Sequence, residues 1–158
     1  MLRPDPIMAL DRVIGIHPRF SAGVVQFNQD AKLASEILYC QANLLLGYHS
    51  KLQKQRLFHD KLQTTIENFI VTKNHAITFC KQPASMTANR GNRTSEDILV
   101  TIWDLEENQE PVFQFRPPLG KLKGVTLSRD AGGLCIYGKD FQNRELILIY
   151  AFQDMARF

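Results

Sequence analysis

The stretch from Asp97 to Leu105 constrains the fold of this chain more than any other. It reads Asp-Ile-Leu-Val-Thr-Ile-Trp-Asp-Leu, and it carries the one Trp of the sequence close to its end. β-Branched and aromatic residues suit a pleated, half-buried surface, so this stretch is the surest strand in the chain. Its meaning for the whole fold depends on whether the rest of the sequence repeats around it.

The length and composition indicate one soluble globular domain. The chain has 158 residues, of which 44% are hydrophobic and 22% are charged, which argues against disorder. Its net charge of +3 is carried by scattered Lys and Arg residues. Nucleic-acid binding usually needs a basic stripe or patch, so no nucleic-acid partner is expected.

The sequence also predicts a cytoplasmic protein that is not held in a membrane. No apolar run reaches the ~20 residues that span a bilayer. The N-terminus, Met1 to Pro6, is polar and contains two prolines, unlike a signal peptide. The three cysteines follow no metal-binding spacing, so reduced thiols are expected.

About a dozen short strands separated by turn residues predict an all-β fold built from hairpins. Ser50 to Gln63 is ambiguous, because its partial helical spacing competes with a strand from Gln53 to Phe58, and the strand is favoured. The long polar stretch from Gln82 to Glu96 is expected to be a loop. The predicted strands are 10–17, 23–27, 36–40, 44–48, 53–58, 66–72, 76–81, 98–105, 112–115, 123–128, 134–138 and 146–152.

These strands form a repeat. Three of them end on or near an aromatic residue, Tyr48, Trp103 or Tyr150, at separations of about 50 residues, a period typical of propellers and solenoids. Each follows two shorter strands, and the first two are followed by a fourth. A strand that closes on Trp103-Asp104 within such a repeat indicates a partial WD-repeat β-propeller, in which Trp103 packs between blades.

The repeat sets the predicted domain boundaries. The partial propeller spans residues 10–152, with blades at about 10–58, 64–115 and 122–152, and the third blade lacks its outer strand. Residues 1–9 and 153–158 are expected to be tails. The strand Leu10 to His17 would supply the outer strand of a closing blade. Fewer than three full blades cannot close a propeller, so the sequence is expected either to be a fragment or part of a split protein or to complete a larger assembly, with a chain that completes the propeller as an expected partner.

No motif of the sequence predicts catalysis, a metal or a cofactor. Cys40, Cys80 and Cys135 fall in the same strand of each blade and are expected to be small buried hydrophobes, with a metal site as the alternative. Histidines 49, 59 and 75 lie at strand ends or turns, without a metalloprotease motif, nucleophile elbow or phosphate-binding loop. Arg90 and Arg93 could hold an acidic partner, although a solvated loop is the simpler interpretation.

Several segments occur in an order that is informative together: Val13-Ile14-Gly15-Ile16, Glu36-Ile37-Leu38-Tyr39, Gln55 to Phe58, Ile98 to Leu105, Gly124 to Asp130 and Leu134 to Asp140. This order resembles the first blades of the echinoderm microtubule-associated protein-like family and of the related cilia- and flagella-associated WD-repeat proteins. The Gly-His pair usual before a blade is missing, and His59 is the candidate for its histidine.

The resemblance implies a non-enzymatic structural protein of a ciliary or flagellar microtubule assembly, with tubulin or other axonemal proteins as partners. A WD-repeat scaffold in another intracellular complex is the alternative, because a fold does not fix a function. A small enzyme or a ligand-binding β-barrel is also compatible with the strand count, although no acid–base pair, nucleophile or metal cluster favours it.

Overall fold

The structure is a computed structural model, and it describes residues 25–27, 36–62, 64–71, 75–82, 97–106, 110–128 and 132–151. These residues form eleven strands and no helix, arranged in three antiparallel sheets. The predicted fold class is therefore confirmed as all-β, with two four-stranded sheets and a third sheet of three strands. The predicted strand at 10–17, the tails, Arg90 and Arg93 lie outside the described residues.

The first sheet is a meander of four consecutive strands. They are β1 (Val25–Phe27), β2 (Glu36–Gln41), β3 (Leu44–His49) and β4 (Lys54–Phe58). Ala42 makes the tight turn between β2 and β3 with a φ of 50°. The ambiguous segment after residue 50 forms a turn followed by β4, so the strand interpretation is confirmed; pairing with β3 satisfies its backbone groups there.

The middle sheet repeats the same order. It consists of β5 (Ile66–Val71), β6 (His75–Gln82), β7 (Asp97–Asp104) and β8 (Pro111–Phe115). β7 is the Trp-Asp strand, and six successive residues in it, Ile98 to Trp103, are buried. Continuous burial along a strand means that both faces of its sheet are covered.

The third sheet has three strands. They are β9 (Lys121–Leu127), β10 (Gly133–Lys139) and β11 (Glu145–Ala151). Asp140 holds the turn between β10 and β11, because its Oδ1 accepts hydrogen bonds from the backbone N–H groups of Gln142 and Arg144, both at 2.8 Å. A positive φ of 66° at Asn143 completes this turn.

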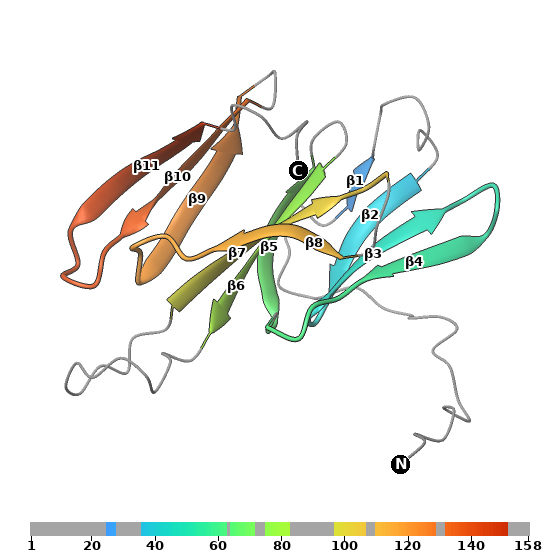
Figure 1. Ribbon diagram of the computed structural model, residues 1–158, viewed down its shortest axis with the longest axis horizontal. Helices are drawn as coiled ribbons and strands as arrows, with labels where there is room; N and C mark the ends of the chain where they lie inside the picture. Colours follow the sequence, from blue (N-terminus) through green and yellow to red (C-terminus); the bar gives the residue numbers. More distant parts are fainter. Residues whose placement is uncertain are drawn as a thin grey trace, which may run out of the picture.

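The three sheets stack face to face, with the middle sheet between the other two (Figure 1). One apolar core lies between the first and middle sheets, and a second lies between the middle and third sheets. The first core comprises Leu38, Cys40, Leu45, Phe58, Ile66, Phe69, Ala76, Trp103 and Leu105. The second comprises Ile77, Phe79, Ile98, Val100, Ile102, Leu119, Leu134 and Ile136.

The strand registers show that the sheets are equivalent copies of one arrangement. Tyr48, Trp103 and Tyr150 each lie in the third strand of their sheet. Their cross-strand partners are Ile37, Ala76 and Leu134, which are each the second residue of the preceding strand. With side chains alternating between faces, this register gives the positions in the second and third strands of one sheet counterparts in the next.

Candidate protein-interaction surface

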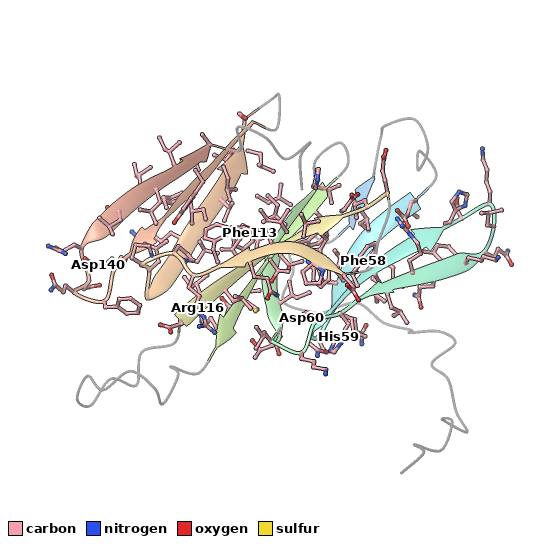
Figure 2. All side chains as sticks on the ribbon, in the orientation of Figure 1. Phe58, His59, Asp60, Phe113, Arg116 and Asp140 are labelled. Atoms are coloured by element: carbon pink, nitrogen blue, oxygen red, sulfur yellow. The ribbon has the colours of Figure 1, made fainter. Side chains whose placement is uncertain are left out.

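Trp103 is buried between the first and middle sheets. Its indole Nε1 donates a 2.9 Å hydrogen bond to the Thr78 hydroxyl, which is also buried. The Phe58 ring, at the end of β4, lies edge-on to the indole with 6.0 Å between ring centroids. This edge-on geometry is favourable for aromatic pairs. Phe58 is labelled in Figure 2, where the first and middle sheets meet.

The same aromatic pairing recurs between the middle and third sheets. Phe115 ends β8 as Phe58 ends β4, and its ring centroid is 4.7 Å from that of Tyr150. Desolvation by burial raises the pKa of the Tyr150 phenol. At each interface, the phenylalanine of one sheet's fourth strand therefore packs on the aromatic residue of the next sheet's third strand.

A partly buried ion pair within the first sheet also contacts the residue that follows β7 of the middle sheet. The Glu36 carboxylate, 1% exposed, receives hydrogen bonds from Arg56 Nη2 at 2.7 Å and Nε at 2.8 Å. Arg56 Nη1 donates to the backbone oxygen of Leu105 at 2.9 Å. Gly47 lies between the two strands, where a Cβ atom would overlap the Glu36 carboxylate. This bidentate pair fixes the edge of the first sheet against the middle one.

Asp104, the residue after Trp103, holds the end of β7. Its Oδ1 accepts a 2.7 Å hydrogen bond from the backbone N–H of Glu106, the pattern of an Asx turn. Tyr48 is half-buried in β3. Of the predicted structural positions, Trp103 and Tyr150 therefore lie at sheet interfaces, and Asp104 forms a turn.

The face of the third sheet that points away from the middle sheet is apolar and exposed. We call it the outer face, and its large apolar side chains are Tyr137, Ile147 and Ile149. They are 45%, 72% and 78% exposed, respectively. Tyr137 pairs with Ile147 across β10 and β11, so the three side chains are neighbours. The Tyr137 ring also crosses β9 at Gly124, where a Cβ atom would overlap it.

Basic and acidic side chains lie next to one another at one end of the outer face. Lys121, Lys139 and Glu145 pair in register across the three strands. Lys123 Nζ contacts Glu145 Oε1 at 2.5 Å, and this contact lowers the pKa of the Glu145 carboxyl. Asp140 marks this end of the sheet in Figure 2. The centre of the outer face thus remains aliphatic and aromatic.

The expectation that all three cysteines are buried is wrong for Cys135. Cys40 and Cys80 are buried in the core, and burial raises the pKa of each thiol. Cys135 is partly exposed because it alternates with Leu134 and Ile136, whose side chains fill the second core. It therefore lies on the outer face. The third sheet is covered on one face, so a cysteine in β10 is not necessarily buried, although β10 is equivalent to β2 and β6.

The described histidines lie at strand ends or beyond them. His59 is exposed and its Nε2 is 3.3 Å from the Asn43 amide nitrogen, and His49 Nδ1 accepts a hydrogen bond from the backbone N–H of Leu52. Within the described residues, no three His, Cys, Asp or Glu side chains gather closely enough to hold a metal ion. No helix in the described part of the chain is long and apolar enough to span a membrane.

The residues that define this surface differ from the candidates predicted from the sequence. Ile147 and Ile149 alternate with Leu146, Leu148 and Tyr150, so β11 is apolar on both faces. A strand with two apolar faces is expected to be covered twice, and that pattern was available in the sequence. Phe58 and Phe115 gave no such signal, because their pairing with Trp103 and Tyr150 depends on how the sheets stack.

Comparisons with known proteins give no family assignment: no protein-family model matches the chain, and no curated protein matches it significantly.

Proposed function

We propose that this protein is a non-enzymatic scaffold of the WD-repeat β-propeller type, which binds other proteins through its stacked sheets. The observation that carries the proposal is the outer face of the third sheet. Ile147 is 72% exposed, whereas its counterparts Leu45 and Val100 are completely buried between sheets. All three lie three residues before the aromatic residue of the equivalent strand.

The chemistry of the outer face favours a protein partner. Tyr137, Ile147 and Ile149 present aliphatic and aromatic surface at its centre. Grouped exposed apolar side chains are typical of sites that bind other proteins. A nucleic-acid site would instead place Lys and Arg along the strands, and here the lysines lie at one end, where Lys123 pairs with Glu145.

The proposed setting is a ciliary or flagellar microtubule assembly, in the cytoplasm and cytoskeleton, with tubulin or axonemal proteins as partners. Its support is the resemblance of the segments around Val13, Glu36, Ile98 and Gly124 to cilia- and flagella-associated WD-repeat proteins. A WD-repeat scaffold in another intracellular complex is the second candidate, and the outer face is compatible with it as well.

Co-sedimentation with purified microtubules tests this setting. The full chain is expected to pellet with microtubules, and the variant Ile147→Thr/Ile149→Thr is expected to pellet less. Leu62→Thr is the matched control, because Leu62 is an exposed aliphatic residue, at 52%, outside the outer face. If the protein neither pellets with microtubules nor remains on salt-washed axonemes, the ciliary setting is wrong and the scaffold of another complex is the better candidate.

A further inference from the structure

In the described part of the chain, the third sheet has three strands, and the fourth strand of the other two sheets has no counterpart in it. In the first sheet β4 pairs with β3, and in the middle sheet β8 pairs with β7. Within the described residues, β11, which is the equivalent of β3 and β7, pairs with β10 and has no strand at its other edge. Such an edge presents backbone N–H and C=O groups that a further strand can pair with.

The two fourth strands share one feature that defines what would fit this edge. Each has a phenylalanine directly opposite an equivalent residue of the third strand: Phe58 opposite Leu45, and Phe115 opposite Val100. The counterpart of Leu45 and Val100 in β11 is Ile147. The type of residue that would lie opposite Ile149 is less defined. The equivalents of Ile149 are Gly47, which lies opposite Arg56, and Ile102, which lies opposite Phe113.

We infer that β11 binds an extended segment of a partner protein, which adds to its free edge as an antiparallel strand and places a phenylalanine opposite Ile147. The inference rests on the proposed function as a protein scaffold and names the site and the kind of segment bound. It continues an arrangement already present at the two interfaces of this chain. Strand addition gives affinity through backbone hydrogen bonds and specificity through alternate side chains.

The exposure of β11 supports the inference independently of strand count. Leu45 and Val100 are 0% exposed, because a fourth strand lies beside each and another sheet lies across each. Ile147 and Ile149 remain 72% and 78% exposed, on a strand that lies at the edge of its sheet. A phenylalanine opposite Ile147 on an added strand would cover the Ile147 side chain. Cross-strand pairs of aromatic and β-branched residues stabilise antiparallel strands.

The chain supplies its own probe for the test. A synthetic peptide of residues 110–116, Glu-Pro-Val-Phe-Gln-Phe-Arg, contains β8, the fourth strand of the middle sheet. Added to β11 in the register of β8 on β7, it would place Phe115 opposite Ile147 and Phe113 opposite Ile149. The peptide is titrated to about 1 mM into the full chain, and the hydrogen exchange of individual backbone amides is followed.

The expected result is slower exchange of amides in β11 as the peptide binds. Replacing Phe115 by Ala in the peptide is expected to weaken binding about tenfold. Ile147→Lys in the protein is expected to weaken it at least about fivefold. Thr126→Lys is the matched control, because Thr126 is exposed on the outer face but lies in β9, at the far edge of the sheet. It is expected to leave binding unchanged.

Three results would overturn the inference. One is no protection of β11 at the highest peptide concentration. Another is faster exchange of the amides of β8 without protection of β11, which would mean that the peptide displaces β8 from β7. The third is β11 protected before any peptide is added: a dependence on protein concentration would assign the edge to a second copy, and independence from it would assign the edge to a segment of the same chain. Microtubule co-sedimentation tests the proposed function separately, because it depends on the outer face and not on strand pairing at the edge of β11, so the inference can fail while the proposed function stands.

Discussion

At the scale of single residues, the interface between the first two sheets depends on a few side chains with specific partners. The Trp103 indole N–H donates a hydrogen bond to the Thr78 hydroxyl, and the Glu36 carboxylate accepts hydrogen bonds from Arg56. A buried carboxylate without a cationic partner is costly, whereas a bidentate pair with further hydrogen bonds is tolerated. Arg56 also reaches the Leu105 backbone, so the pair links two sheets rather than two neighbouring strands.

Replacing Glu36 by Gln is expected to lower the free energy of unfolding by about 2–3 kcal/mol. The charge of Arg56 then loses its partner, although the 27% exposure of its side chain lets water compensate in part. Urea unfolding followed by the fluorescence of Trp103 measures the change. Glu145→Gln is the control: its pair with Lys123 is exposed and screened by water, so no measurable change is expected. Equal effects of the two substitutions would refute the structural role of the Glu36 pair.

At the scale of strands, equivalent residues in successive sheets differ in burial, because the sheets differ in how many of their faces are covered. The middle sheet is covered on both faces, and the third sheet is covered on one. Equivalent substitutions in β7 and β11 are therefore expected to differ in their cost. The cysteines show the same contrast in the second strand of each sheet.

Threonine substitutions at two equivalent positions, one in β7 and one in β11, test this difference in burial. Val100→Thr introduces a hydroxyl into a fully buried position and is expected to lower the free energy of unfolding by about 1–3 kcal/mol. Ile147→Thr keeps a β-branched residue at an exposed position, so a change within about 0.5 kcal/mol is expected. Chemical unfolding of the two variants provides the comparison. A loss at Ile147 as large as that at Val100 would mean that β11 is covered.

Thiol modification tests the positions of the cysteines. Cys135 is expected to react with an alkylating reagent in the native protein at mildly alkaline pH. Cys40 and Cys80 are expected to react only after unfolding, because both are buried and burial raises the pKa of their thiols, which keeps them protonated and unreactive. Peptide mapping by mass spectrometry identifies the modified residues. Rapid native labelling of Cys40 would contradict the placement of β2 in the core.

Most strands could be predicted from the sequence, because β-branched and aromatic runs bounded by turn residues are local signals. The repeat favours a strand over a helix in the segment that forms β4, and the structure confirms the strand, although the local spacing is partly helical. Contacts between distant residues could not be predicted: Glu36 meets Arg56 only through the register of β2, β3 and β4. Cys135 was predicted wrongly because burial depends on the neighbouring sheet.

At the scale of the whole molecule, the three sheets form a stack with one repeated interface. Phe58 contacts Trp103, and Phe115 contacts Tyr150, so each fourth strand supplies an aromatic residue to the next sheet. The third sheet ends the stack in the described part of the chain, without a fourth strand and with an exposed apolar face. The proposed scaffold function and the proposed strand addition both depend on this end being accessible.

Solvent paramagnetic relaxation of the isoleucine methyl groups tests that accessibility most directly. A soluble nitroxide added to methyl-labelled protein enhances the relaxation of exposed methyl groups. The methyl groups of Ile147 and Ile149 are expected to relax strongly, and those of Ile77 and Ile102, which are 0% exposed in the second core, are expected to be almost unaffected. If the methyl groups of Ile147 and Ile149 are as protected as those of Ile77 and Ile102 in dilute protein, the third sheet is already covered and the account of an accessible end is wrong.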